Sequence, residues 1–211
     1  MKLLLMSSYF TNDKLKNTFL KMLSKPIKEY KVLIIHQKNY IKKVYPEYSE
    51  YADTMIPRDT KTFTDLGILP ENISSYNVKT EEKPDLSSID IILVQGGNTY
   101  YYLQQIQKNG YWDDIRDFIE RDGVYIGISA GSMMMCPDVD EDLYILEENK
   151  VGIENVTGFG FFPFYIVAHW NSKSDEVREK MLKYGKKTGK HVIPLTDQQG
   201  IQVLENGYKI I

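Results

Sequence analysis

Residues 124–132 read Val-Tyr-Ile-Gly-Ile-Ser-Ala-Gly-Ser, and this stretch decides which fold we expect. An apolar run that leads into Gly-x-Ser-x-Gly predicts a strand that turns sharply into a helix. Such a turn lifts the serine, here Ser129, out as a nucleophile, and the helix start behind it offers N–H groups to an oxyanion. The alternative is that the small residues only let a strand and a helix pack closely. The nucleophile interpretation therefore requires a base and an orienting carboxylate on the same face.

Other apolar runs predict further buried strands. They lie at residues 2–6, 31–35, 89–94 and 164–168, with a weaker candidate at 73–78. Strands that are almost continuously apolar are typical of a parallel sheet that is covered by helices on both faces. We therefore predict an α/β fold, a three-layer sandwich with a mostly parallel sheet.

Segments with helical periodicity separate these runs. One begins near Asn12 or Asp13 and ends at Pro26, and another follows Gly96-Gly97-Asn98. A third ends at Gly123, and a fourth covers residues 174–184. The tyrosine-rich residues 38–68 show only weak periodicity, so we expect a loop or lid region there, with room for one helix.

The last part of the chain predicts antiparallel strands. They lie at residues 191–195, 201–204 and 208–211, and the last two flank Asn206-Gly207. That dipeptide is a strong signal for a tight hairpin. We therefore add a C-terminal antiparallel hairpin to the predicted fold.

Composition restricts the class of protein. The 211 residues are 42% hydrophobic and 26% charged, which is typical of a soluble globular protein, and no linker or repeat divides them. We expect a single domain over residues 1–211. A net charge of −3 gives no electrostatic footprint for nucleic acid, and no apolar run is long enough to span a membrane. The one cysteine, Cys136, fits a reducing compartment, so we expect a cytoplasmic protein.

Two further polar residues lie at the carboxyl ends of predicted strands, where ligands bind in folds of this kind. His169 could take the proton of Ser129 and return it to a leaving group. Asp197 could accept from the second ring nitrogen and fix the tautomer. Each also has a purely structural interpretation, as a hydrogen-bonded histidine or a turn aspartate. His36 also ends a strand, and rival carboxylates lie after the serine helix at Asp138, Asp140, Glu141 and Asp142.

The pair Gly96-Gly97 has two interpretations. The N–H of Gly97 could join that of Ala130 in an oxyanion hole, because glycine lets the backbone approach a substrate closely. Alternatively, the pair is a flexible turn and Asn98 caps the next helix. The motif is not the Gly-x-Gly-x-x-Gly dinucleotide fingerprint, so we expect no nucleotide cofactor.

The acidic loop has part of the spacing of a calcium site. Asp138, Asp140 and Asp142 occupy its first, third and fifth positions. However, Leu143 replaces the required glycine and Asn149 replaces the glutamate at position twelve. We therefore expect a solvated loop and no metal.

Taken together, these motifs resemble the serine peptidase family of aspartyl dipeptidase (peptidase E), to which cyanophycinase is related. The segments that carry the resemblance are Gln95-Gly96-Gly97-Asn98-Thr99, Gly127-Ile128-Ser129-Ala130-Gly131, His169 with its preceding strand, Glu176-Val177-Arg178, and Ile193 through Val203. They span roughly residues 89–204.

The resemblance implies a fold like that of class I glutamine amidotransferases, with serine in place of the nucleophilic cysteine. It implies Ser129 as nucleophile, His169 as base, and Gly97 and Ala130 as oxyanion donors. The third catalytic residue would be Asp197, where the family would have a glutamate, or Asp142 after the serine helix.

The resemblance also implies a small-peptide substrate, possible removal of an N-terminal aspartate, and a monomer or homodimer without cofactor. Arg178 would bind the acidic side chain, with Asn98 also in the substrate site. The alternative for Arg178 is an exposed ion pair with Glu176 or Glu179. Two features differ from what we expect of peptidase E. The segment from His169 to Arg178 is shorter, and no proline directly precedes His169. The alternative functions are an esterase of the α/β-hydrolase type and a catalytically silent binding domain.

Overall fold

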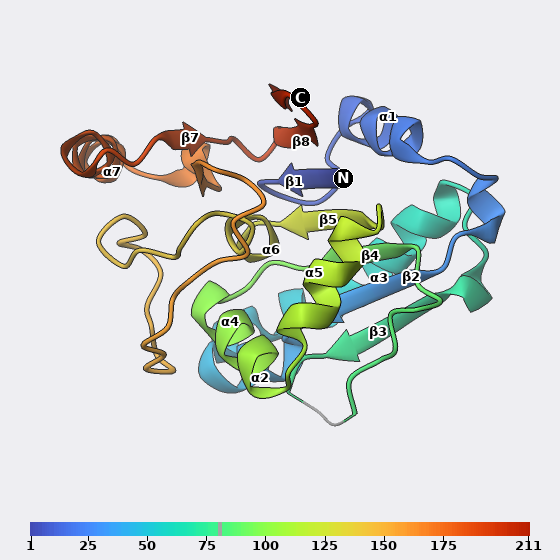
Figure 1. The fold of residues 1–211 in the computed structure, drawn as a ribbon. Coiled ribbons are helices and arrows are strands. Elements are labelled where there is room, and N and C mark those ends of the chain that lie inside the picture. Colours follow the sequence, from blue (N-terminus) through green and yellow to red (C-terminus); the bar gives the residue numbers. More distant parts are fainter. Residues whose placement is uncertain (80–81) are drawn as a thin grey trace.

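A seven-stranded sheet forms the middle of the protein, which we describe from a computed structural model for residues 1–79 and 82–211 (Figure 1). Its strand order is β3-β2-β4-β5-β1-β8-β9. The first five strands of the chain run parallel to one another, and β8 and β9 are added antiparallel at one edge. The strands of the sheet are β1 (Lys2–Met6), β2 (Val32–His36), β3 (Ile73–Asn77), β4 (Ile91–Val94), β5 (Val124–Ile128), β8 (Gly200–Leu204) and β9 (Gly207–Ile210).

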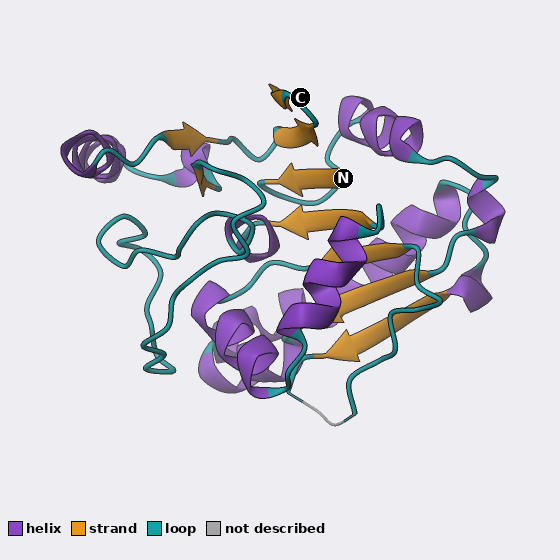
Figure 2. Cartoon of the chain, in the orientation of Figure 1, coloured by secondary structure: helices purple, strands orange, loops and turns teal. Residues whose placement is uncertain are grey.

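Helices connect the parallel strands and lie on both faces of this sheet (Figure 2). They are α1 (Asp13–Met22), α2 (Lys38–Val44), α3 (Ser49–Asp65), α4 (Thr99–Lys108), α5 (Trp112–Glu120), α6 (Ala130–Met133) and α7 (Asp175–Thr188). Short 3-10 turns are formed by Ile27–Glu29, Pro46–Tyr48, Pro70–Asn72 and Trp170–Ser172. Within the part of the chain that the structure describes, none of the helices has the length and apolar character needed to cross a membrane.

Successive side chains of the central strands enter opposite cores, because side chains alternate along a strand. On one face Leu4 packs in a cluster with Phe19 of α1 and Phe63 of α3. On the other, Leu3 belongs to a larger cluster with Ile115 of α5 and residues of α4 and α6. The continuous apolar runs are therefore strands buried on both sides. The predicted three-layer α/β fold with a mostly parallel sheet and a C-terminal antiparallel pair is confirmed.

Residues 38–68 differ from the expected loop or lid, because they form the two helices α2 and α3. The buried face of α3 consists of Ala52, Met55, Asp59 and Phe63, at helical spacing. Two of these four positions carry a small or a charged residue. In addition, Pro57 lies inside the helix, and a proline in a helix interior is normally unfavourable. This combination weakened the periodic signal in the sequence, whereas burial of the Met55 and Phe63 side chains still favours the helix.

The segment 191–195 also differs from its prediction as an antiparallel strand. Its strand β7 (Val192–Pro194) runs parallel to β6 (Tyr165–Val167), and the two form a separate sheet. Helix α7 lies between them in the chain and returns it to the same end, as a β-α-β crossover does. Because β6 and β7 are parallel, the residues that follow them, including His169 and Asp197, come out at the same end.

The α3 assignment can be tested by removing its largest buried side chain. Phe63 is fully buried, and its ring contacts that of Phe19 at 5.9 Å between centroids. We expect Phe63→Ala to lower the free energy of unfolding by about 3–5 kcal/mol, measured by urea denaturation. The exposed Tyr51→Ala on the same helix is the control and should cost far less. Equal small losses would mean that α3 is not part of the core.

Candidate active site

Ser129 lies in a strained turn between β5 and α6, at the carboxyl end of the sheet. Its φ and ψ are 48° and −107°, a combination that non-glycine residues rarely adopt. Its N–H donates to the Met6 carbonyl of β1 at 2.9 Å, which fixes the turn against the neighbouring strand. A Cβ on Gly131 would lie 2.3 Å from the Val94 carbonyl, and one on Gly127 would lie 2.6 Å from the Ser132 nitrogen. Close packing of the turn therefore requires both glycines.

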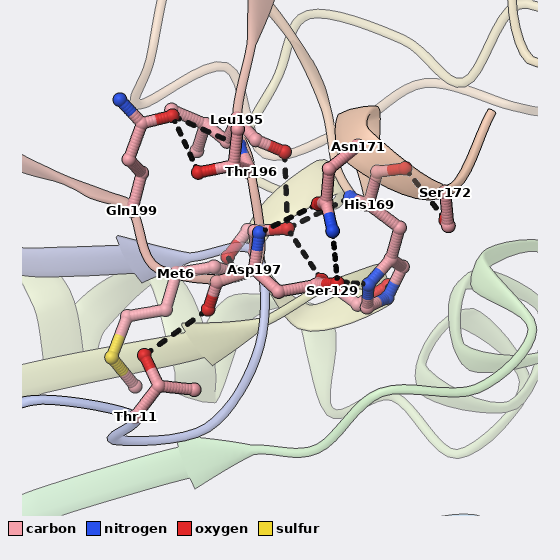
Figure 3. Close-up of polar contacts among 12 residues, drawn as sticks. Met6, Thr11, Ser129, His169, Asn171, Ser172, Leu195, Thr196, Asp197 and Gln199 are labelled. Carbon is pink, nitrogen blue, oxygen red and sulfur yellow. Dashed lines mark hydrogen bonds and ion pairs between the residues drawn. The ribbon is translucent and has the colours of Figure 1, made fainter.

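The structure brings His169 and Asp197 to the Ser129 hydroxyl (Figure 3). The distance from His169 Nε2 to Ser129 Oγ is 3.1 Å, and that from His169 Nδ1 to Asp197 Oδ1 is 2.5 Å. With the ring proton on Nδ1 and donated to Asp197, Nε2 is free to accept from the serine hydroxyl. This geometry is the one that activates a hydroxyl as a nucleophile.

The imidazole is held by backbone contacts as well as by Asp197. His169 has a left-handed backbone with a φ of 54°, and its N–H donates to the Ser7 hydroxyl at 2.7 Å. The carbonyl of His169 accepts from the hydroxyl and the N–H of Ser172, at 2.8 and 3.1 Å. The ring orientation is therefore set by the end of β1 and by the turn that follows β6.

The Asp197 carboxylate is also fixed from several sides. Asn171 donates its side-chain N–H to Oδ2 at 3.2 Å and accepts the backbone N–H of Asp197 at 3.0 Å. Burial raises the pKa of Asp197, but hydrogen bonds from His169, Asn171 and Ser7 outweigh it, so its pKa lies below the ordinary value. The carboxylate is thus ionised at neutral pH and can stabilise a positive imidazole.

The rival candidates from the sequence lie elsewhere. Asp142 contacts the Tyr184 hydroxyl at 3.5 Å and has no contact with His169. His36 ends β2 and its Nδ1 accepts from the Lys38 N–H at 3.3 Å, while burial and the Lys38 charge lower its pKa to about 4. His191 packs on Phe164 before β7. Of the three histidines, the one at the serine hydroxyl is His169.

Two backbone N–H groups lie beside the serine turn. Gly97 lines the same cavities as Ser129, and Ala130 begins α6 directly after it. Within residues 1–79 and 82–211, neither N–H has a hydrogen-bond partner. Gly97 has a φ of 141°, and a Cβ there would lie 2.5 Å from the Gln37 side chain. Gln37 donates to the Asn98 carbonyl at 3.0 Å and so holds this loop from behind.

Two adjoining cavities meet at Ser129. The larger, about 480 Å³, is lined in part by Ile41 of α2, by Tyr45 and Tyr48 between α2 and α3, and by Tyr51 of α3. The smaller, about 190 Å³, extends toward β6 and α7. The residues common to both are Gly97, Ser129, Leu146, Glu147 and His169. A substrate with its reacting bond at Ser129 would therefore extend into one cavity on each side.

Comparison with known proteins assigns the chain to a family. The model of peptidase family S51 matches residues 3–211, nearly the whole chain. The chain belongs to peptidase family S51.

The names of curated relatives are consistent with this family of serine-type peptidases. Peptidase E of Salmonella arizonae is 28% identical over 131 residues, 61% of this chain and 52% of that protein. Peptidase E of an Escherichia coli strain is 24% identical over 142 residues, 66% of this chain and 62% of that protein. An uncharacterised peptidase of Pasteurella multocida is 32% identical over 89 residues, 41% of this chain and 42% of that protein. The matched part thus spans about half the length of these relatives.

Solved structures show the same fold. A candidate peptidase E protein from Listeria monocytogenes EGD-e superposes with a TM-score of 0.73 at 21% identity, covering 100% of this chain and 97% of that one. A peptidase from an acI-B1 Actinobacterium gives a TM-score of 0.59 at 13% identity, covering 100% of this chain and 86% of that one. The S51 architecture therefore extends over the whole chain.

Arg178 does not lie where the resemblance to the peptidase E family led us to expect it. Its Nε donates to the Trp170 carbonyl at 3.0 Å and its Nη2 to the Asn171 carbonyl at 3.1 Å. Its Nη1 pairs with Asp175 at 3.0 Å, and Arg178 lines neither cavity at Ser129. The guanidinium thus contacts the turn after His169 and the start of α7, and the role of Arg178 toward substrate stays a prediction.

Asn98 lines the larger cavity, but its side chain has structural partners. Its Oδ1 accepts from the Tyr101 N–H at 2.9 Å and caps α4, and its Nδ2 donates to the Glu148 carbonyl at 2.9 Å. The capping interpretation from the sequence therefore describes this side chain, and its role toward substrate stays a prediction.

The acidic loop after α6 is neutralised by a lysine. Lys190 lies 2.8 Å from Asp138 and 2.7 Å from Asp140, and Tyr165 and Tyr184 donate to the same two carboxylates. Within the described residues, no group of three or more histidines, cysteines or acids could hold a metal ion. The loop acids thus serve the packing of α7 and β6.

Several site residues were not identified from the sequence. Ser7 and Asn171 hold His169 and Asp197, and Glu147 and Lys173 line the smaller cavity. Asn171 had a weak signal, since it lies two residues after His169. Ser7 and Glu147 had none, because the turns that bring them to Ser129 are set by the tertiary fold.

The identity of the orienting acid can be tested directly. We expect Asp197→Asn to lower kcat by roughly 10⁴-fold, because the amide would favour the wrong tautomer of His169. The matched control, Asp142→Asn, should keep nearly full activity. Steady-state kinetics on the same peptide substrate would measure both variants. A larger loss in the Asp142 variant would reverse the assignment.

Arg178 offers a second test. We expect Arg178→Met to lower kcat by a similar factor for acidic and neutral peptides, because it loosens the turn that carries His169 and Asn171. Measuring kcat/KM on an aspartyl dipeptide and on its asparaginyl counterpart gives the comparison. A loss restricted to the acidic substrate would return Arg178 to the binding site.

Proposed function

We propose that the protein is a serine peptidase that cleaves small peptides through an acyl-enzyme. The observation that supports this most strongly is the line of contacts from Asp197 through His169 to Ser129, at 2.5 and 3.1 Å. The strained Ser129 turn adds to it, since strain of this kind is concentrated at functional sites. This is the turn that the sequence predicts as a nucleophile elbow.

In the proposed reaction, Ser129 Oγ attacks the scissile carbonyl while its proton moves to His169 Nε2. Asp197 stabilises the imidazolium that forms, and the N–H groups of Gly97 and Ala130 stabilise the oxyanion. His169 then gives the proton to the leaving amine as the C–N bond breaks. A water molecule, deprotonated by the same imidazole, then attacks the ester, and His169 returns this proton to Ser129 Oγ as the C–O bond breaks and the carboxylic acid is released.

Dipeptides with an N-terminal aspartate are the substrate class that we propose first. The resemblance to the peptidase E family implies this preference, and the dimensions of the site are compatible with it. Cavities of about 190 and 480 Å³ adjoin Ser129 and have room for a residue on either side of the scissile bond.

An esterase of the α/β-hydrolase type is the weaker alternative. That fold places its acid before its histidine in the chain, whereas Asp197 follows His169. Asp142, which would restore the esterase order, contacts Tyr184 instead. A binding domain without catalysis is the other alternative, and it predicts an unreactive Ser129.

The nucleophile assignment is tested by Ser129→Ala. We expect turnover of an aspartyl dipeptide to fall by about 10⁴-fold or more, and labelling by a fluorophosphonate probe to disappear. Ser87→Ala, at an exposed serine before β4, is the control and should react like the wild type. Labelling that persists without Ser129, or a wild type that neither reacts nor cleaves peptides, would refute the proposal.

A further inference from the structure

The smaller cavity at Ser129 contains two charged groups that have no role in the proposed proton transfers. Most of its wall is apolar, formed by Met133, Tyr144, Leu146, Val167, Ala168 and Met181. The charged residues in this wall are Glu147 and Lys173. Charged groups in a mostly apolar cavity are unfavourable unless a partner neutralises them, so the partners of each group decide what the cavity can bind.

Lys173 has no partner of its own. It follows the turn Trp170–Ser172 and is partly buried, and its Nζ has no hydrogen bond or ion pair within residues 1–79 and 82–211. Burial lowers the pKa of Lys173, while the charges of Asp197 and Glu147 act in the opposite direction. The pKa of Lys173 is lowered because burial outweighs these two charges, and no direct contact neutralises its ammonium within the described residues.

Glu147 lies where the two cavities meet. Its Oε1 accepts the N–H of Thr99 at the start of α4. Burial raises the pKa of Glu147 to about 7, although the bond from Thr99 lowers it. No ion pair joins Glu147 to Lys173 in the described part of the chain. One cavity thus presents a carboxylate and an ammonium that do not neutralise each other.

A ligand that carries one cation and one anion a few bonds apart would satisfy both groups. An N-terminal aspartyl residue has this pattern, with its α-ammonium next to the scissile carbonyl and its carboxylate at the end of the side chain. Glu147 lines both cavities, as Ser129 does, whereas Lys173 lines only the smaller cavity. The order of the two charges in the cavity therefore matches the order in the ligand.

We propose that Glu147 and Lys173 form the binding site for the N-terminal residue of the substrate, in which Glu147 receives the free α-ammonium and Lys173 the acidic side chain. This inference rests on the proposed peptidase function and assigns residues to its substrate selection. It explains how an S51 chain can select an acidic residue although Arg178 is turned away from the cavity. It also predicts that the free amino group is required, so the enzyme removes single N-terminal residues.

The Lys173 assignment is tested with Lys173→Met. We expect its kcat/KM on Asp-Leu to fall at least about thirtyfold, as for loss of a buried charge partner, while Asn-Leu is cleaved nearly as by the wild type. Lys180→Met, at an exposed lysine of α7, is the matched control and should change neither substrate. Equal losses on Asp-Leu and Asn-Leu would overturn the assignment.

The Glu147 assignment is tested with Glu147→Gln and a pair of substrates that differ in one group. Asp-Leu carries the α-ammonium, and succinyl-Leu is the same molecule without it. We expect the wild type to prefer Asp-Leu at least about thirtyfold and the variant to lose most of this preference. A preference that survives in the variant would assign the ammonium to another group.

Thermal stability gives a readout that is independent of turnover. The charged and titratable groups around Glu147 are Lys173, His169, Tyr40, Tyr100 and Tyr144. Because the folded pKa of Glu147 is raised, the wild type loses stability as the pH rises from about 4.5 through 7. Glu147→Gln should therefore have a higher Tm than the wild type at pH 8 and a similar one at pH 4.5. No difference at pH 8 would mean that the carboxylate is already neutralised.

Binding without catalysis separates this inference from the proposed function. In Ser129→Ala, calorimetry should detect Asp-Leu, and adding Lys173→Met or Glu147→Gln should weaken binding at least about thirtyfold. If the wild type cleaves Asp-Leu and these variants bind it equally well, the subsite is refuted and the peptidase function stands. If the wild type cleaves nothing while the charge variants still lose binding, the function is refuted and the subsite stands.

Discussion

The candidate site depends on the carboxyl end of β1, where two consecutive residues hold three distant segments together. The Met6 carbonyl accepts the N–H of Ser129 at 2.9 Å and the hydroxyl of Ser132 at 2.7 Å. The buried Ser7 hydroxyl accepts the N–H of His169 at 2.7 Å and donates to the Leu195 carbonyl at 3.2 Å. The central position of β1, between β5 and β8, lets one strand end serve both sides of the site.

This arrangement explains how strained backbone is retained at the site. Ser129 and His169 both have positive φ, at 48° and 54°, and such residues cost of order 1–3 kcal/mol each. Each one donates its N–H to the end of β1, a buried strand that hydrogen bonds on both of its edges. The strained backbone is therefore supported by a strand that is paired on both edges, and the two side chains are held in contact with each other.

The sequence predicted those parts of the structure whose signals come from neighbouring residues, and it missed those that depend on contacts between distant residues. The strand before Ser129, the hairpin near Asn206 and the cap at Asn98 are encoded by neighbouring residues, and all of them are present. Helix α3 gave only a weak periodic signal because Ala52, Asp59 and Pro57 interrupt its apolar pattern, and it is stabilised by Phe63 packing on Phe19, 44 positions away in the chain. Glu147 and Lys173 were missed for the same reason, since only the folded chain shows which charges lack a partner.

The different positions of Arg178 and Lys173 have a common origin in the short segment after His169. Only one 3-10 turn and a serine cap separate the histidine from α7. The Trp170 carbonyl accepts the Lys173 N–H and still has a second lone pair, so the planar guanidinium of Arg178 can bind it and the Asn171 carbonyl at once. The turn then ends at Lys173, whose flexible side chain lines the smaller cavity beside Ser129. The short connection thus gives the two cations different surroundings: the arginine stabilises the turn, and the lysine lines the cavity.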